Sequence, residues 1–587
     1  MPIMTGARAM VETMTEYDTE LVVGYIGHCT HELADALTGH PTIRSFPPAT
    51  EYGGGSIVNG YNYVKGRPAA LAAWHSVGSF VASGPIFEAQ IGRIPSIHLG
   101  FNVDGTMKDR EAMQEMPNHE VFRNITKFST RVERPDKLPE ALHKAFQLAQ
   151  VGRLGPAFID IPFDITIDEA DMVIPRGWKA PSVRQTADPA DVEQILDLLL
   201  QAERPVLLVG GGGARSGAGP EVLALAEALA LPVATSSTAM GILPEDHPLS
   251  LGLCGTIGWP IANEAIRTAD VVLVAGSRLS DWGYAQAWAA DLPGRLIHID
   301  NDPEQIGAFY FPELGIVGDV KAVLGQLVDA VQRRGAHAVA SNVLEARRAR
   351  TSEQRESWLG ILRERWASDE FPMSPWRVVH DVQAQLDDDD IIVVDAGSNT
   401  SWVFQGTVVR KPYTLLAPFG VGNLGTAFPM GIGAKLAAPD SKVVVMTGDG
   451  GFHYTFNEMS TAVREDIPVV AVVFNNGYYG SNLGFMNTLY GHAEWVKLAN
   501  PDFAAIARAY GGYGETVSSA DEVGPAVQRA FESGLPAIID VPINPDYGYS
   551  ATGAGPTIRW EPRLWPGDPT GAKRPGKLSD QLSEVTG

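Results

Sequence analysis

The stretch that decides the fold is Ser441 to Gly480, SKVVVMTGDGGFHYTFNEMSTAVREDIPVVAVVFNNGYYG. It begins with the apolar run Val443 to Met446, which is followed by the turn Gly448-Asp449-Gly450-Gly451 and by a helical pattern. A second apolar run, Pro468 to Phe474, ends at Asn475-Asn476. A buried strand, a glycine turn and a helix make a β-turn-α unit, whose loop amides and helix N-terminus suit a diphosphate.

Asp449 places a carboxylate in this turn, where it would repel a phosphate group. A hard cation between the two anions removes the conflict, and Mg²⁺ takes oxygen ligands from one or two carboxylates and from phosphates. Asn476 follows the next strand, so its amide oxygen can join the same shell. We therefore expect a metal-bridged diphosphate held by Gly448, Gly450 and Gly451, although a lone Gly-Asp-Gly is more often only a tight turn.

Length and composition exclude several classes of protein. The 587 residues suit three or four domains of ordinary size. A formal net charge of -24 argues against a nucleic-acid or anionic-membrane surface. No apolar run approaches the ~20 residues of a membrane helix, and the first ten residues lack the apolar core of a signal peptide. Cys29 and Cys254 are too far apart to form a motif, which favours a reduced, cytoplasmic chain.

Short apolar runs alternate with helical patterns along the chain, which predicts an α/β fold of doubly wound parallel sheets. Three such domains are expected, at residues 1–175, 190–340 and 370–550, and the first and third look like architectural copies. The charged stretch Glu345 to Asp369 is interpreted as a connecting helix. Residues 551–587, rich in Gly and Pro and slightly basic, are interpreted as a C-terminal arm, either a lid or a disordered tail.

The runs expected to be strands lie at Leu21–Ile26, Ala69–Trp74, Ser96–Gly100 and Ala157–Ile161 in the first domain, and at Val233–Thr235, Val271–Ala275 and Leu296–Ile299 in the second.

The segment Pro48-Ala49-Thr50-Glu51-Tyr52-Gly53-Gly54 places a glutamate between a strand and a glycine-bearing helix. An acid at a helix start is ordinarily only a partner of the helix dipole, worth under about 1 kcal/mol. With the Gly-Asp-Gly and Asn-Asn motifs, however, it resembles thiamine-diphosphate enzymes of the acetohydroxyacid synthase and pyruvate oxidase family. The resemblance implies that Glu51 hydrogen-bonds the aminopyrimidine of the cofactor and promotes loss of its C2 proton, while the cofactor supplies the electron sink.

The same resemblance implies further roles around the cofactor. Asp449, Asn476 and the backbone carbonyl of Tyr478 would bind magnesium, and Leu424, after Gly422, would wedge beneath the bent cofactor. It also implies that the Glu51 domain of one subunit meets the metal domain of another, so that a homodimer is the minimum and a homotetramer is expected. A second diphosphate loop would contain Gly397, Ser398, Asn399 and Thr400.

Glycine turns and strand-end acids in the middle domain suit an adenine nucleotide, with an acid holding the ribose hydroxyls. In similar chains this domain holds FAD or, in the oxalyl-CoA decarboxylase branch, ADP, and an empty domain is the third alternative. The residues expected to contact the nucleotide are Gly211, Gly212, Gly213, Ser277, Arg278, Asp300 and Asp319.

Histidines close to the first strands of the amino-terminal domain bear on the substrate. His28 and His31 lie three residues apart in a turn where the wider family has small residues, and His75 follows another strand of this domain. Neutral imidazoles can protonate a carbonyl or help to hydrate it. Surface histidines are the plainer alternative, and a metal site lacks a third ligand nearby.

This constellation resembles the branch of the family that hydrolyses cyclic 1,2-diketones such as cyclohexane-1,2-dione. The resemblance implies that His28, His31 and His75 transfer protons and hydrate the substrate carbonyl. Gln114 would help to hold the cofactor-substrate adduct, and Asn482 would shape the pocket. Glu494 departs from the expected amide, so it either changes what is protonated or is solvated on a loop. The resemblance is carried by VVGYIGHCTH (22–31), PATEYGG (48–54), NGYNYVKGR (59–67), AWHSVG (73–78), RVERPDKL (131–138), ARSG (214–217), GSRLSDWG (276–283) and FYFP (309–312).

Diketone hydrolysis is therefore the main functional expectation, with a small carbonyl compound as substrate and neither nucleic acid nor membrane as partner. A 2-hydroxyacyl-CoA lyase, which forms a carbonyl compound and formyl-CoA, is an alternative that ADP and a basic arm over the CoA thioester would favour. An acetolactate synthase-type carboligase is a third, weakened by His28 and His31. A non-enzymatic paralogue would require a lost Glu51 or a broken motif, and neither is lost.

Overall fold

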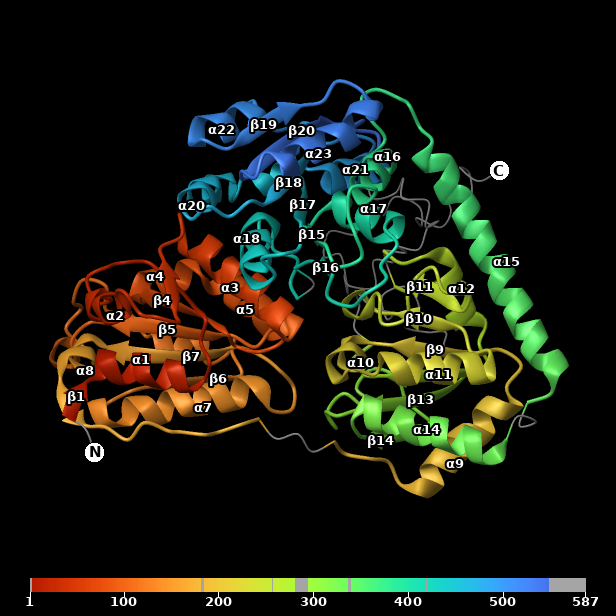
Figure 1. Ribbon diagram of the computed structural model, residues 1–587, viewed down its shortest axis with the longest axis horizontal. Coiled ribbons are helices and arrows are strands. Elements are labelled where there is room, and N and C mark those ends of the chain that lie inside the picture. The colour runs from red at the N-terminus through yellow and green to blue at the C-terminus, as the bar shows by residue number, and fades with distance from the viewer. Residues whose placement is uncertain are drawn as a thin grey trace, which may run out of the picture.

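The computed structural model describes residues 3–180, 184–255, 257–279, 294–335, 339–418 and 420–547. Three α/β domains follow one another, each built on a six-stranded sheet with helices on both faces (Figure 1). Every strand pair within these three sheets is parallel, as predicted. The arm predicted at residues 551–587 lies outside the described residues.

The amino-terminal sheet has the strand order β3-β2-β4-β5-β7-β6. The four predicted strands are β2, β4, β5 and β7, and each is largely buried and apolar. The edge strands β3 and β6 were not predicted, because they are short and mix polar with apolar residues. The strands are β2 (Leu21–Gly24), β3 (Arg44–Phe46), β4 (Ala70–His75), β5 (Ile97–Asn102), β6 (Phe128–Arg131) and β7 (Ala157–Pro162), beside the antiparallel pair β1 (Ile3–Thr5) and β8 (Glu169–Asp171).

Helices of this domain are α1 (Gly6–Glu16), α2 (His31–Leu37), α3 (Glu51–Lys65), α4 (Ser76–Val81), α5 (Ser83–Gly92), α6 (Asn118–Phe122), α7 (Leu138–Gln150) and α8 (Phe163–Ile167).

The central sheet has the order β11-β10-β9-β12-β13-β14, so the strand order reverses between β9 and β12. In open α/β sheets a ligand binds at such a reversal, outside the carboxyl ends of the two strands. The strands are β9 (Pro205–Val209), β10 (Val233–Thr235), β11 (Ser250–Leu253), β12 (Val271–Ala275), β13 (Arg295–Asp300) and β14 (Leu314–Val317). The helices are α9 (Pro189–Gln201), α10 (Gly211–Ser216), α11 (Gly219–Leu229), α12 (Pro260–Thr268) and α14 (Val320–Arg334).

The carboxy-terminal sheet has the order β16-β15-β17-β18-β20-β19, which in relative terms is the order of the amino-terminal sheet. The expected likeness of these two domains is therefore one of topology. The strands are β15 (Ile391–Val394), β16 (Leu415–Leu416), β17 (Val443–Gly448), β18 (Val470–Asn475), β19 (Tyr513–Thr516) and β20 (Ala537–Pro542). The helices are α16 (Pro375–Gln383), α17 (Ser398–Gly406), α18 (Ala427–Ala437), α19 (Asp449–Phe452), α20 (Met459–Arg464), α21 (Gly480–Tyr490), α22 (Phe503–Tyr510) and α23 (Val523–Glu532).

The expected connecting helix is α15 (Ser341–Trp366), which runs along the outside from the central to the carboxy-terminal domain (Figure 1). Its mean hydropathy is low, yet Trp358 and Leu362 are buried in the core. Among the described residues, no helix combines the length and apolarity needed to span a bilayer.

The first and third domains meet where α3 packs on α18, and glycines set that distance. A Cβ added to Gly433 would lie 1.9 Å from the carbonyl oxygen of Ile57, and one added to Gly60 would lie 2.1 Å from that of Met430. The two backbones thus approach more closely than any side chain permits. Helix α3 begins at Glu51, so this contact fixes the predicted base relative to the domain that carries Asp449.

Candidate functional site

Asp449 lies directly after β17, and its carboxylate ties together the turns that follow β17 and β18. Oδ1 accepts a hydrogen bond from the amide of Gly450 at 2.9 Å, and Oδ2 accepts one from the amide of Gly477 at 2.7 Å. The side chain is 2% exposed. Burial raises the pKa of Asp449, and these hydrogen bonds oppose the rise. The predicted glycine turn is in fact the first turn of the short helix α19.

Asn476 and Tyr478 lie on the second of these turns. The amide of Tyr478 donates to Oδ1 of Asn476 at 3.0 Å, and the amide of Asn476 donates to Oδ2 of Asp449 at 3.2 Å. The structure therefore brings together the three residues that were expected to bind the metal. The described residues contain no group of three or more His, Cys, Asp or Glu that could hold a metal. A cation here must take amide, carbonyl and phosphate oxygens besides the one carboxylate, which is the manner of Mg²⁺.

The second diphosphate loop follows β15 and meets the first. Gly397 has a φ of 132°, and α17 begins at Ser398, whose Oγ is buried without a hydrogen-bond partner. A Cβ added to Gly480 would lie 3.1 Å from Nδ2 of Asn476 and 3.7 Å from Oγ of Ser398, so the two loops share one space. A free buried hydroxyl at a helix N-terminus is suited to an anion.

Asn399 and Thr400 were expected to donate to the diphosphate, and the structure shows their side chains bonded within the protein. Nδ2 of Asn399 and Oγ1 of Thr400 both donate to the backbone carbonyl of Asp395, each at 2.7 Å. Asn and Thr often close turns with such local bonds, so residue type did not separate the two roles. The backbone amide of Thr400 is engaged as well, because it donates to the carbonyl oxygen of Gly397 at 3.2 Å.

Asp395 is a buried acid close to the expected site, and the sequence did not single out its side chain. Its buried carboxylate accepts hydrogen bonds from the amide of Gly425 at 2.9 Å and from Oγ1 of Thr447 at 3.1 Å. Burial raises the pKa of Asp395 to about 6. These bonds fix the loop of Gly422 and Leu424, the expected wedge residue, against the ends of β15 and β17.

The wedge loop also contacts the helix of the predicted base. The hydroxyl of Tyr52 donates to the carbonyl oxygen of Leu424 at 2.7 Å, and Leu424 itself is half-buried. Tyr52 is the second residue of α3 and follows Glu51 directly.

Glu51 is the first residue of α3, with Thr50 as the N-cap. Its Oε1 lies 3.8 Å from Nε2 of His75, which ends β4. A Cβ added to Gly78 would lie 2.7 Å from the same oxygen. The side chains of Glu51 and His75 are only 16% and 15% exposed. The carboxylate therefore sits in a narrow niche between the starts of α3 and α4, with an imidazole beside it.

The loop that carries His28 and His31 packs against His75. A Cβ added to Gly27 would lie 2.6 Å from Cδ2 of His75. His28 lies exposed in the turn before α2, with its ring centroid 6.0 Å from that of Phe163, and His31 is the exposed first residue of α2. Within the described residues no hydrogen bond joins either histidine to Glu51, so the structure makes them neighbours of the niche rather than parts of it.

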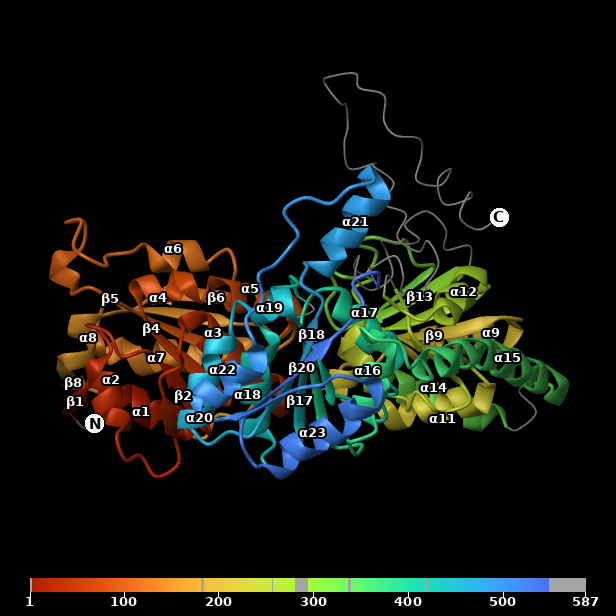
Figure 2. The ribbon, with the colours of Figure 1, turned by 90° about the horizontal axis from the view of Figure 1, so that it is seen from above.

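The remaining predicted substrate residues lie apart from this niche in the single chain. Gln114 is half-buried in the loop after β5, with a φ of 72°. Asn482 lies on α21, which stands out from its domain (Figure 2), and is exposed. Glu494 is exposed on the following loop, which agrees with the alternative prediction of a solvated carboxylate.

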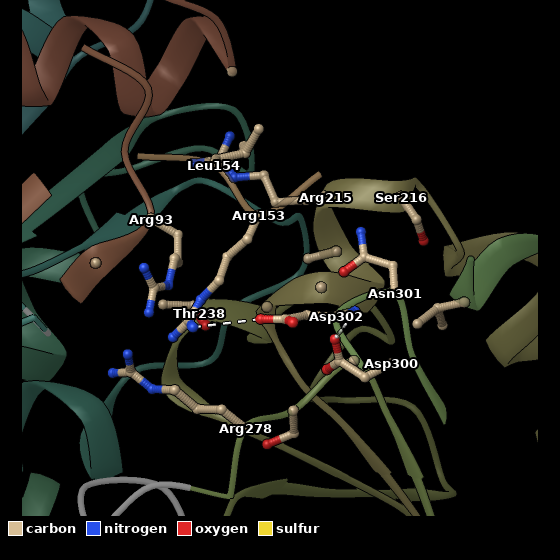
Figure 3. Close-up of a pocket in the computed structure, with 18 of the residues that line it drawn as sticks. Arg93, Arg153, Leu154, Arg215, Ser216, Thr238, Arg278, Asp300, Asn301 and Asp302 are labelled. Atoms are coloured by element: carbon tan, nitrogen blue, oxygen red, sulfur yellow. Dashed lines mark hydrogen bonds and ion pairs between the residues drawn. The ribbon is translucent and has the colours of Figure 1, made fainter. Parts of the chain in front are cut away.

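A cavity of about 820 Å³ lies at the strand reversal of the central sheet, and residues of the amino-terminal domain form part of its lining (Figure 3). Six of the seven residues expected to contact a nucleotide line it. The exception is Gly213, because a Cβ there would lie 2.6 Å from Cγ1 of Val209. Gly213 thus lets α10 pack on β9. The six are Gly211, Gly212, Ser277, Arg278, Asp300 and Asp319.

Arginines from two domains gather around this cavity. Arg93 and Arg153 come from the amino-terminal domain and lie near Arg278 (Figure 3), and the sequence did not point to either of the first two. Nη1 of Arg153 lies 3.3 Å from Oδ2 of Asp302. The guanidinium of Arg215 lies between two rings, 4.7 Å from the centroid of Tyr63 and 4.5 Å from that of Tyr413.

The two predicted ribose acids differ in their surroundings. Asp319 caps α14 through the amide of Ala322 and pairs with Nη1 of Arg184 at 2.8 Å, so much of its hydrogen-bonding capacity is used within the protein. Asp300 ends β13, and its burial raises its pKa. Asp300 is therefore the better candidate for the ribose hydroxyls.

Comparisons with known proteins agree with this arrangement. Three family models match the chain: the N-terminal TPP binding domain of thiamine pyrophosphate enzymes at residues 4–121, their central domain at 192–327 and their C-terminal TPP binding domain at 395–541. Thiamine pyrophosphate and thiamine diphosphate are the same compound. The matched segments contain Glu51, the strand reversal of the central sheet and Asp449 respectively.

Several curated relatives are acetolactate synthases. The acetolactate synthase large subunit of Corynebacterium glutamicum is 31% identical over 99% of this chain and 95% of its own. The probable acetolactate synthase large subunit of Methanocaldococcus jannaschii is 31% identical over 92% of each chain, and acetolactate synthase isozyme 1 large subunit of Escherichia coli is 29% identical over 92% of this chain and 94% of its own. These relatives favour the carboligase among the functions expected from the sequence, and they give no support to the diketone hydrolase. The chain belongs to the thiamine pyrophosphate enzyme family.

Proposed function

We propose that this enzyme cleaves the carbon–carbon bond between the carbonyl groups of a 1,2-diketone by addition of water. The observation that carries the proposal is the position of His75, 3.8 Å from Glu51 and packed against Gly27. It sets one imidazole beside the predicted base and a loop with two more next to it. Such a cluster suits steps in which water and carbonyl groups exchange protons.

When bound, thiamine diphosphate supplies a carbon nucleophile and an electron sink at the atom next to the substrate carbonyl. The residues present fit the group. The unpartnered hydroxyl of Ser398 and the amides that begin α17 would receive the diphosphate. Asp449, with the amide oxygen of Asn476 and the carbonyl of Tyr478, would hold Mg²⁺ against it.

Glu51 would hold a ring nitrogen of the cofactor and move a proton at its own carboxylate. The niche supports that role because Gly78 leaves room for the carboxylate while the start of α4 shields it. Leu424 would set the cofactor conformation, and its position is fixed through Asp395 and Tyr52. Hydrogen bonds between different structural elements thus hold the loop of Leu424 in place.

His75 would then serve the substrate rather than the cofactor. Adding one water to a cyclic 1,2-diketone while the bond between the carbonyl carbons breaks gives one open chain with an aldehyde and a carboxylic acid. Nothing is oxidised or reduced overall, so no further reactant is required. An imidazole would give a proton to the departing carbon and take one from the water. His28 and His31, on the neighbouring loop, would assist these proton transfers.

The second candidate function is acetolactate synthesis, in which two molecules of pyruvate give acetolactate and carbon dioxide. The printed names of the relatives favour it, at 31% identity over 99% of this chain. The histidine cluster is the feature that this candidate leaves unexplained. The CoA-dependent lyase would be favoured by ADP in the central domain and by a basic arm at residues 551–587, which lies outside the described residues.

An assay with matched substrates separates these candidates. Purified protein with Mg²⁺ and thiamine diphosphate is given cyclohexane-1,2-dione, pyruvate or a 2-hydroxyacyl-CoA ester, and products are identified by mass spectrometry. The proposal expects the open-chain oxo-acid from the diketone, with one oxygen from labelled water. Acetolactate from pyruvate without diketone turnover would replace it with the second candidate.

We propose further that the central cavity holds an adenine nucleotide, FAD or ADP. Its position at the strand reversal, its volume of about 820 Å³ and its arginines support this proposal. Arg153, Arg215 and Arg278 would face the phosphates and Asp300 the ribose. A yellow protein whose extract contains FAD supports the flavin, ADP in a colourless extract supports ADP, and an empty extract that takes up neither contradicts both.

We propose finally that the working unit is at least a homodimer and that it forms a homotetramer. Within the described residues no hydrogen bond joins Glu51 to Asp449, and apolar side chains are exposed on helix α4 and on neighbouring segments of both domains. Such exposed apolar groups are typical of subunit contacts. They are Tyr25, Ile26, Val77, Val81 and Tyr454. Sedimentation equilibrium gives the mass directly, and a monomer at all concentrations would contradict the proposal.

A further inference from the structure

Asn500 lies beside Asp449, at the end of the loop before α22. It belongs to none of the motifs that the sequence analysis singled out. Its Nδ2 donates to Oδ2 of Asp449 and to Oδ1 of Asn475, both at 2.7 Å. Its Oδ1 lies 2.9 Å from Nε2 of His453. Every polar atom of this side chain is therefore engaged. Two of its partners, Asp449 and His453, are far from Asn500 in the sequence, and Asn475 is nearer.

These partners determine which way the amide faces. The two groups beside Nδ2 are acceptor oxygens, so the reversed amide would set an oxygen against a carboxylate and against another amide oxygen. The imidazole on the other side can donate its Nε2 proton to Oδ1. His453 is itself held by edge contacts with the ring of Phe503, at 5.6 Å between centroids. The NH2 group is thus fixed toward Asp449.

The orientation of Asp449 follows from this contact. Its Oδ2 accepts three N–H groups, from Gly477 at 2.7 Å, Asn476 at 3.2 Å and Nδ2 of Asn500 at 2.7 Å. Its Oδ1 accepts one bond from the described part of the chain, from the amide of Gly450 at 2.9 Å. A carboxylate oxygen has about two lone-pair sites. Oδ2 is therefore saturated, and Oδ1 is the oxygen that keeps a lone pair for a cation.

Asn500 also connects the site to the strands beneath it. The Nδ2 of Asn475 donates to Oδ1 of Asp540 at 3.0 Å, and Asp540 lies on β20. A chain of hydrogen bonds therefore runs from His453, after α19, through Asn500 and Asn475 to β20. It braces the turns after β17 and β18 against each other.

We propose that Asn500 is a positioning residue of the metal site, which turns the Asp449 carboxylate so that Oδ1 faces the ion. This inference rests on the proposed magnesium site, and it identifies Asn500 as the residue that orients the carboxylate of Asp449 there. Partners of this kind, one shell beyond the ligands, typically change metal affinity by about 10–100-fold when removed.

The experiment titrates Mg²⁺ into cofactor-free protein at a fixed, saturating concentration of thiamine diphosphate, by calorimetry. The matched control is Asn263, a buried asparagine in the central domain that bonds both the amide and the carbonyl of Gly255, at 2.8 and 3.0 Å. Asn500→Ala is expected to weaken Mg²⁺ binding by about 10–100-fold. Excess Mg²⁺ should restore cofactor binding. Asn263→Ala should lower the melting temperature and leave Mg²⁺ affinity unchanged.

Unchanged Mg²⁺ affinity in Asn500→Ala overturns the inference, and so does an equal loss in both variants, which would show a general effect of stability. If Asn500→Ala does not fold, His453→Phe decides, because it keeps the ring contacts and removes the donor that orients the amide. Weaker Mg²⁺ binding in that variant supports the inference, and unchanged binding overturns it. Wild-type protein that binds neither Mg²⁺ nor the cofactor would instead refute the proposed function.

Discussion

The carboxylate of Glu458 accepts hydrogen bonds from both the backbone amide and the hydroxyl of Thr50, at 2.9 and 3.0 Å. Glu458 belongs to the carboxy-terminal domain and is fully buried, and Thr50 is the N-cap of α3. A third bond comes from the amide of Ala49 at 3.0 Å. A Cβ added to Gly53 would lie 2.0 Å from the same carboxylate. One domain thus holds the helix turn from which Glu51 projects in the other.

The first prediction concerns this carboxylate. Glu458→Gln sets an amide NH2 among groups that are themselves donors, so at least one buried donor loses its partner, at a cost of about 1–3 kcal/mol. We expect lower stability and a turnover reduced at least about tenfold, because the start of α3 shifts. Chemical denaturation and steady-state kinetics measure the two effects.

The control measurement for Glu458→Gln is cofactor and metal binding, because the magnesium site lies on other loops. Affinity for Mg²⁺ and thiamine diphosphate should stay close to that of the wild type. A variant with normal turnover would show that the contact with Thr50 serves stability alone.

The second prediction separates the two halves of the proposed active site. Glu51→Gln should abolish turnover and retain the bound cofactor, since the amide cannot move the proton but keeps the shape of the niche. Asp449→Ala should lose Mg²⁺-dependent retention of the cofactor, because it removes the one carboxylate of the metal site. Equilibrium dialysis of the cofactor distinguishes the variants. Full activity in Glu51→Gln would refute the role of the base.

Mixing these two inactive variants tests the shared site. If Glu51 of one subunit acts with Asp449 of the other, each mixed dimer contains one wild-type site, and activity returns when subunits are exchanged. If both residues of a site come from the same chain, every site in the mixture stays defective. Samples that contain only one of the two variants, treated in the same way, are the control.

The sequence was most informative where one local pattern determines both structure and chemistry. The run from Val443 to Gly451 predicted a buried strand that leads into a helix start, and the structure shows β17 followed by α19. Glu51 was predicted at the start of a helix after a strand, which is confirmed for α3. In each case the neighbours in sequence are also the neighbours in space, so a short window contains the physical cause.

The residues that were missed act through contacts between distant segments. Glu458 reaches Thr50, Asn500 reaches Asp449, and Arg153 reaches Asp302 from another domain. No periodicity or spacing marks such a residue, because its partner is decided only when the sheets assemble. Gly213 shows the reverse error, since a glycine that permits helix packing looks the same in sequence as one that approaches a phosphate.

The third prediction concerns the histidines. His28→Ala and His31→Ala should lower product formation from the diketone more than they lower cofactor affinity, because both residues lie outside the Glu51 niche. His75→Ala should affect both, since its ring lies 3.8 Å from Glu51 and packs on Gly27. Product analysis and cofactor titration on the three variants measure the difference. His40, a half-buried histidine on another loop of the same domain, provides the control variant His40→Ala. Equal diketone turnover in wild type and all three variants would remove the main support for hydrolysis.

The fourth prediction concerns Glu245, a fully buried carboxyl between the central and carboxy-terminal domains. One of its oxygens accepts the amide of Val409 at 2.8 Å, and the other has no partner. Burial raises the pKa of Glu245 from 4.5 to about 8, against the opposing effect of Arg355. The folded protein therefore keeps this proton over a pH range in which the unfolded chain has released it.

Folding stability must then fall as the pH rises through that range. Below about pH 4.5 both states hold the proton and the contribution is complete, and by pH 8 it is lost. In between, this one group lowers the free energy of unfolding by at most about 1.4 kcal/mol per pH unit. Glu245→Gln cannot titrate, so its stability should depend less steeply on pH, although both proteins share every other titrating group. Urea denaturation of the pair across this range gives the difference directly, and parallel curves would mean that Glu245 stays ionised in the folded protein.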